Sequence, residues 1–150
     1  MPEPTYRQAT PDDAEAIANV GRTMLDELGD ASGLPGPPTL DAVAERIRGY
    51  GDAGAMFVCE DGDSTCGFAA LEPEPEEGCA VMGVWLLPSS RRRGIGRELA
   101  LMALEFARNA GYRKVRGTLP AGNEAALSFF SEIGALAQVV GGGMQYELPL

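Results

Sequence analysis

Three consecutive arginines and two nearby glycines form the segment of this chain with the clearest chemistry. Arg91–Arg93 is followed by Gly94, Ile95 and Gly96, and a helical pattern begins at Arg97. Glycine lets a backbone approach a phosphate closely, and the first amides of a helix have no partner inside that helix. Arginine adds positive charge and paired hydrogen-bond donors. The segment therefore predicts a site for a phosphate-bearing ligand, of which a pyrophosphate is a natural example.

Two elements must position this segment. Cys79–Leu87 is a nearly continuous apolar run, as expected for a strand buried on both faces, and Pro88 ends it. Residues 97–110 carry apolar side chains at helical spacing, and Gly111 stops the pattern. A phosphate loop between a central strand and a regular helix is stronger evidence than the same residues would be elsewhere.

The remaining elements predict a mixed α/β fold with one central sheet. We find no internal repeat and no interior linker, so residues 1–150 are expected to form a single domain. The predicted strands are Tyr6–Ala9, Ala55–Glu60, Thr65–Leu71, Cys79–Leu87, Lys114–Leu119, Leu136–Val140 and Met144–Leu148, and the predicted helices begin near Thr10, Thr39, Arg97 and Asn123.

Two common phosphate-binding motifs do not fit residues 91–96, called the glycine segment below. A dinucleotide fingerprint requires a third glycine, and the corresponding position is Leu99. A nucleoside-triphosphate loop requires Gly-Lys-Ser or Gly-Lys-Thr, which the chain lacks.

The segment resembles the acetyl-CoA signature of the GNAT superfamily of N-acetyltransferases, with Arg91, Gly94 and Gly96 at its fixed positions. Val84–Pro88 is similar to the end of that family's fourth strand, and Asn123–Phe130 is similar to its Asn-x-x-Ala-x-x-Phe-Tyr helix. The resemblance covers almost the whole chain. It implies a GNAT-like domain: a mostly antiparallel sheet of six to seven strands, splayed between strands 4 and 5 and flanked by about four helices.

The resemblance also implies roles for individual residues in binding acetyl-CoA. The strand backbone near Trp85 and Leu86 would bind the pantetheine arm. Asn123 would contact the pantetheine or serve only as a helix cap, and Trp85 would be part of the core or line the acceptor pocket. Phe130 would pack beside the cofactor sulfur. The pyrophosphate would be held by the segment Arg91, Arg92, Arg93, Gly94, Ile95, Gly96 and Arg97.

The catalytic residues are less well matched to the family. Phe130 stands where the family often has a tyrosine that protonates the departing thiolate, and residues 79–87 lack the carboxylate often found on the fourth strand. We predict Glu77, just before that strand, as general base; the alternative is a solvated acidic loop. The predicted function is acetyl transfer from acetyl-CoA to a primary amine of a small molecule or protein by direct attack in a ternary complex. The alternative function is a non-catalytic module that binds acetyl-CoA or CoA, and a third is an unrelated protein that binds a sugar phosphate or a nucleotide.

Composition limits the other possibilities. The chain has 150 residues, no histidine and a net charge of −10, which disfavours nucleic-acid binding. Three cysteines without a Cys-x-x-Cys pair argue against a metal site. The absence of a long apolar segment or a secretion signal predicts a cytoplasmic protein that does not bind membranes. The family resemblance implies that a homodimer is possible.

The charge is unevenly distributed along the chain. Eight of the twelve basic residues lie within residues 88–116, which suits an anionic ligand. Seven acidic residues and no basic residue lie within residues 60–77. This acidic region favours a cationic acceptor such as a polyamine, an aminoglycoside or a lysine side chain, although a solvated acidic surface is the simpler interpretation.

Overall fold

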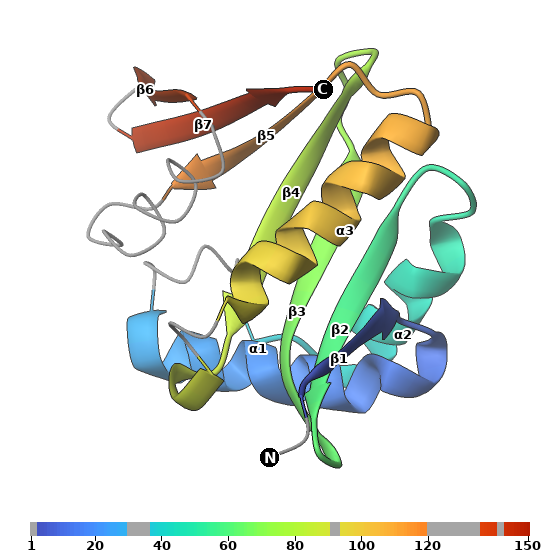
Figure 1. The fold of residues 1–150 in the computed structure, drawn as a ribbon, viewed down its shortest axis with the longest axis vertical. Helices are drawn as coiled ribbons and strands as arrows, with labels where there is room; N and C mark the ends of the chain where they lie inside the picture. Colours follow the sequence, from blue (N-terminus) through green and yellow to red (C-terminus); the bar gives the residue numbers. More distant parts are fainter. Residues whose placement is uncertain (1–2, 30–36, 91–93, 120–135, 141–142) are drawn as a thin grey trace.

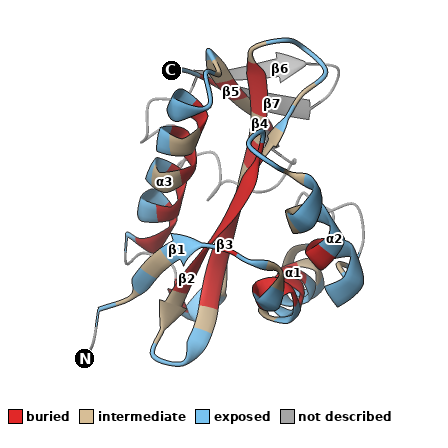
Figure 2. Cartoon of the chain, turned by 90° about the vertical axis from the view of Figure 1, so that its right-hand side faces the viewer, coloured by how far each residue is buried: buried red, intermediate tan, exposed pale blue. Residues whose placement is uncertain are grey.

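The described part of the chain forms one seven-stranded sheet with helices on both faces (Figures 1 and 2). The computed structural model describes residues 3–29, 37–90, 94–119, 136–140 and 143–150. The strand order is β1-β2-β3-β4-β5-β7-β6, and neighbouring strands run antiparallel except β4 and β5, which run parallel. The strands are β1 Thr5–Gln8, β2 Ala55–Asp61, β3 Ser64–Pro73, β4 Cys79–Leu86, β5 Lys114–Leu119, β6 Leu136–Val140 and β7 Gly143–Pro149.

The helices divide between the two faces of the sheet. Helix α3 (Ile95–Asn109) covers one face, whereas α1 (Ala14–Leu28) and α2 (Leu40–Gly49) cover the other (Figure 2). Two short 3₁₀ turns, η1 (Pro11–Asp13) and η3 (Pro88–Ser90), precede α1 and follow β4. Within the described ranges, no helix has both the length and the apolar character needed to cross a membrane.

Alternation along the inner strands gives each face of the sheet its own core. From Gly67 onwards, odd-numbered residues of β3 lie on the α3 side and even-numbered residues lie on the side of α1 and α2. The α3-side core includes Phe57, Leu71, Ile95, Leu99 and Val115. The core below α1 and α2 includes Ile17, Met24, Val43, Val58 and Phe68.

The sequence predictions of the fold are confirmed in the described residues, with shifts at element ends. The helix predicted from Thr10 begins as η1 and becomes regular at Ala14, because Thr10 and Pro11 start a 3₁₀ turn. The predicted Thr39 cap accepts a hydrogen bond from the Ala42 amide at 3.2 Å. Helix α3 begins at Ile95, two residues before the predicted start. The fourth predicted helix, from Asn123, lies outside the described residues.

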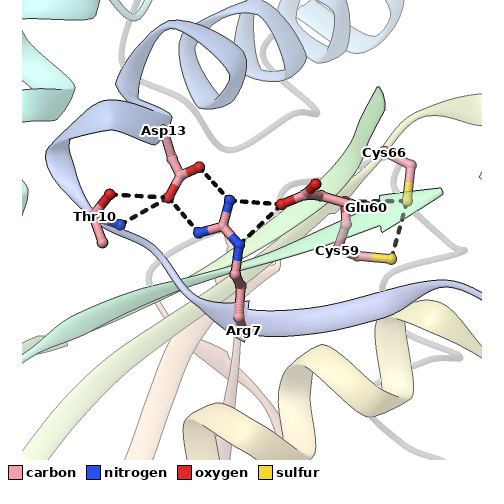
Figure 3. A network of polar contacts seen from close by, with 6 residues as sticks. All are labelled: Arg7, Thr10, Asp13, Cys59, Glu60 and Cys66. Carbon is pink, nitrogen blue, oxygen red and sulfur yellow. Dashed lines mark hydrogen bonds and ion pairs between the residues drawn. The ribbon is translucent and has the colours of Figure 1, made fainter. Parts of the chain in front are cut away.

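A polar network fastens the start of the first helix to the sheet (Figure 3). Two guanidinium nitrogens of Arg7 on β1 donate to the two carboxylate oxygens of Asp13, each at 2.7 Å. Arg7 Nε also donates to Glu60 of β2 at 2.9 Å, and Asp13 accepts from the Thr10 amide at 2.8 Å. These bonds, chiefly those from Arg7, hold the pKa of Asp13 below its ordinary value.

We expect Asp13→Asn to lower the free energy of unfolding by about 2 kcal/mol at pH 7, because charge-assisted hydrogen bonds to a largely buried carboxylate are lost. The folded pKa is depressed, so this contribution is present above the unfolded pKa of about 3.9 and is lost as pH falls through the folded pKa. Urea denaturation at several pH values measures this contribution to the free energy of unfolding. The control is Asp12→Asn, which changes the exposed neighbouring aspartate in the same way. A stability difference that does not shrink in acid would contradict the assignment.

Candidate functional site

Strands β4 and β5 form a fork. They pair at three positions, Cys79↔Lys114, Ala80↔Val115 and Val81↔Arg116. Beyond Val81 the described strands have no further β4–β5 pair, while residues 82–86 of β4 continue to pair with β3. Figure 1 shows β5 running away from β4 beyond this point. The predicted splay between the fourth and fifth strands is therefore confirmed.

The described end of the glycine segment, from Gly94, lies at the open end of the fork, where α3 begins and where η3 follows β4 (Figure 1). Gly94 is the N-cap residue of α3 and has φ +80° and ψ 2°, a left-handed conformation that favours glycine. The Glu98 amide donates to the Gly94 carbonyl at 3.2 Å, which closes the first helical turn. The amides of Ile95 to Arg97 precede that bond, and amides at this position have no acceptor within their own helix.

The start of α3 is packed against the core on one side and open on the other. Ile95 is only 1% exposed and packs in the α3-side core, and Gly96 is also buried. Arg97 is exposed. No described atom lies within 4 Å of where a Cβ on Gly94 would stand. A phosphate group could therefore approach the start of α3, where the helix dipole and free amides favour an anion.

Within the fork, alternate side chains of β4 pack against the two different cores of the sheet. Val84 and Leu86 pack against the α3-side core, whereas Trp85 packs against the core below α1 and α2. The Trp85 ring stacks on Phe68 with centroids 4.9 Å apart. A Cβ on Gly83 would lie 2.2 Å from the Trp85 ring, so the absence of a side chain at Gly83 lets the indole lie over the strand.

Charged side chains flank Val81, which is the last residue of β4 that pairs with β5 and therefore marks the apex of the fork. Sequence reasoning did not find this arrangement. Glu72 of β3 and Arg116 of β5 lie on either side of Val81, on the face away from α3. Glu72 accepts a hydrogen bond from the Tyr50 hydroxyl at 2.6 Å and forms an ion pair with Arg46 at 2.7 Å. Burial and the Glu72 carboxylate raise the pKa of Tyr50, so its hydroxyl stays protonated. Strand register aligns Glu72 and Arg116 with Val81, and Arg46 and Tyr50 reach Glu72 from α2 and its C-terminal cap.

Glu77, the predicted general base, lies at the other end of β4. It sits in the turn before Cys79, where its carbonyl accepts a hydrogen bond from Arg113 at 3.2 Å. Strand β4 separates this turn from the glycine segment by about 23 Å, at roughly 3.3 Å per residue. The structure therefore places Glu77 beside the residues that follow α3, at the end of β4 opposite Trp85 and Leu86.

We expect Glu77→Gln to leave kcat nearly unchanged. Loss of a true general base lowers rates by about 100-fold or more. Glu77 precedes the last β4–β5 pair, at Val81, by four residues, which is roughly 13 Å of extended chain at about 3.3 Å per residue, and a general base must lie within hydrogen-bond reach of the proton that it takes. Steady-state kinetics measure the effect, with Glu76→Gln as matched control, since Glu76 is adjacent and binds Arg116 at 2.5 Å. A large kcat loss confined to Glu77→Gln would contradict this expectation and support Glu77 as the general base.

Five predicted site residues lie outside the described residues, and their roles stay predictions. The structure does bring the other cofactor-binding candidates to the open part of the fork: Trp85 and Leu86 at the end of β4, and Gly94 to Arg97 at the start of α3. The five are Arg91, Arg92, Arg93, Asn123 and Phe130.

Comparison with known proteins gives consistent results. Residues 23–135 match the model of the acetyltransferase (GNAT) family. The uncharacterized N-acetyltransferase YjgM of Escherichia coli strain K12 is 29% identical over 138 residues, which are 87% of this chain and 81% of that protein.

Solved structures share the fold at lower identity. The PaiA N-acetyltransferase of Thermoplasma acidophilum, in complex with coenzyme A, has a TM-score of 0.84 at 16% identity, covering 99% of this chain and 100% of that one. A phosphinothricin acetyltransferase of Sinorhizobium meliloti, in complex with acetyl-CoA, has a TM-score of 0.82 at 20% identity, covering 98% of this chain and 88% of that one.

Proposed function

Since this chain belongs to the acetyltransferase (GNAT) family and is an N-acetyltransferase, we propose that acetyl-CoA is its donor and a cationic primary amine its acceptor. The observation that carries the proposal is the fork between β4 and β5, which opens onto the glycine-capped start of α3. Structural neighbours crystallised with coenzyme A or acetyl-CoA support the choice of donor.

In this proposal the start of α3 binds the pyrophosphate of the donor. Amides from Gly94 to Arg97 donate to its oxygens, and the side chains of Arg91–Arg93 add positive charge. The β4 backbone near Trp85 and Leu86 binds the pantetheine arm within the fork. Asn123 and Phe130 complete the contacts near the reacting end, as the family resemblance implies.

The acceptor approaches from the face of the sheet that carries α1 and α2. Helix α3 closes the opposite face over Val84 and Leu86, so an amine that enters over Gly83 and Trp85 meets the thioester carbon without displacing the donor. Holding both substrates in one complex converts the attack into an effectively unimolecular step. Strand-backbone amides stabilise the developing oxyanion.

The acceptor class follows from charge. The net charge of −10 attracts cations to the surface. On the acceptor face, Glu72 and Glu74 lie close to the fork apex, and Glu74 pairs with Arg116 at 3.7 Å. We favour polyamines, aminoglycosides and exposed lysine side chains over neutral or anionic amines.

An acetylation assay tests this function. The protein is incubated with acetyl-CoA and separately with spermidine, kanamycin, a lysine peptide and glutamate, and both free thiol and acetylated amine are measured. We expect a cationic amine to yield equal amounts of thiol and product. Binding of acetyl-CoA without any acetylated amine would favour the non-catalytic binding module instead.

A further inference from the structure

Two buried cysteines lie side by side on neighbouring strands, outside the site described above (Figure 3). Cys59 on β2 is the Cα partner of Gly67 on β3, and the next partners along the ladder are Glu60 and Thr65. Cys66 is thus the extra residue of a β-bulge, with no partner of its own in the ladder. The bulge turns Cys66 towards Cys59 and not to the opposite face of the sheet.

The two thiols are already in contact. Cys66 Sγ lies 3.1 Å from Cys59 Sγ and 3.4 Å from the Cys59 carbonyl oxygen. A disulfide needs about 2.05 Å between the sulfurs, so closing it requires a movement of about 1 Å. The Sγ of Cys79, the third cysteine, contacts the Ala80 oxygen at 3.7 Å, and no contact with another cysteine is seen among the described residues.

We propose that Cys59 and Cys66 form a dithiol site that reacts with low-molecular-weight disulfides to give a reversible intramolecular disulfide. Cys66, as thiolate, attacks one sulfur of the external disulfide and releases one thiol. Cys59 then attacks Cys66 Sγ and releases the second thiol. Two protein thiols are oxidised and one external disulfide is reduced to two thiols, so atoms and electrons balance.

The hairpin geometry provides a route for the reagent. Cys66 is 4% exposed and Cys59 is 0% exposed, so the first attack assigned to Cys66 uses the less buried thiol. Only two ladder pairs, Glu60↔Thr65 and Asp61↔Ser64, separate the cysteines from the exposed turn at Gly62 and Asp63. Opening of a hairpin end is a low-energy local fluctuation, and it uncovers Cys66 without unfolding the sheet.

The full chain is treated with oxidised glutathione under native conditions and analysed by peptide mass spectrometry. We expect a Cys59–Cys66 cross-link that lacks two hydrogen atoms, is reversed by dithiothreitol, and leaves Cys79 unmodified. Cys79→Ser is the matched control and should form the same cross-link. No reaction, stable glutathionylation of one cysteine, or pairing with Cys79 at comparable yield would each overturn the proposal.

Thermal melting of the oxidised protein provides a second test. The bond closes a short loop, so an unstrained disulfide should raise Tm by several degrees, roughly 5 °C, by restricting the unfolded chain. The Cys59→Ser and Cys66→Ser variants should show no shift after the same treatment. A lower Tm for the oxidised parent would show that the folded structure does not hold the thiols in position, and would overturn the proposal.

Discussion

Replacing Gly94 with glutamate is expected to weaken acetyl-CoA binding by at least about 100-fold, equivalent to roughly 2.7 kcal/mol. Gly94 has φ +80°, a conformation that costs other residues about 1–2 kcal/mol. The added carboxylate would also stand where the pyrophosphate is proposed to bind, at the positive end of α3. Calorimetric titration with acetyl-CoA measures the loss.

The opposite end of the same helix offers a matched control. Gly111 also has a positive φ, +92°, and no described atom lies within 4 Å of its Cβ position. Gly111→Glu therefore introduces the same backbone strain and the same charge away from the fork, and should leave acetyl-CoA affinity unchanged. Gly94→Ala separates strain from charge and should lose about tenfold or less. Equal losses from Gly94→Glu and Gly111→Glu would contradict a phosphate site at Gly94.

Gly83→Val is expected to lower kcat/KM by about 100-fold, because a displacement of about 1 Å at a reacting centre has an effect of this size. Any Cβ at this position would lie 2.2 Å from the Trp85 ring. The indole would leave its stacked position on Phe68, and the surface over which the acceptor is proposed to enter would change. Trp85 is the sole tryptophan of the chain, so its fluorescence reports the displacement directly.

The clash can be removed to test its cause. A Trp85→Leu background has no indole at this position. In that background the additional effect of Gly83→Val on kcat/KM and on the free energy of unfolding should be small. This double-mutant cycle isolates the contact between the two positions. An equal penalty for Gly83→Val in both backgrounds would show that the Trp85 ring is not responsible.

Much of the fold was predictable because its signals are local. The apolar run at Cys79–Leu87 predicts a central strand, observed as Cys79–Leu86, and Gly94 and Gly96 before a regular apolar stripe predict a helix start exposed to an anion. Thr39 caps α2 as predicted. These features depend on neighbouring residues along the chain, which sequence shows directly.

Features that depend on register were not predictable. The bulge between Cys59 and Cys66 and the row of Glu72, Val81 and Arg116 result from how separate strands align. Glu77 also shows the limit of proximity in sequence: it directly precedes β4, but the structure places it at the end of β4 opposite Trp85 and Leu86, and its role as general base stays a prediction. Distance along a strand, not proximity in sequence, decides which carboxylate can reach a substrate.

The most direct test of the account is a calorimetric comparison of acetyl-CoA with S-acetylpantetheine, which carries the thioester and pantetheine arm but lacks the pyrophosphate and the 3′-phosphoadenosine attached to it. We predict one acetyl-CoA per chain with a Kd between about 1 μM and 1 mM, in the range of typical enzyme substrates, and binding of S-acetylpantetheine that is weaker by about 100-fold or more. Equal affinity for the two ligands, or no binding of acetyl-CoA, would contradict a pyrophosphate site at the start of α3.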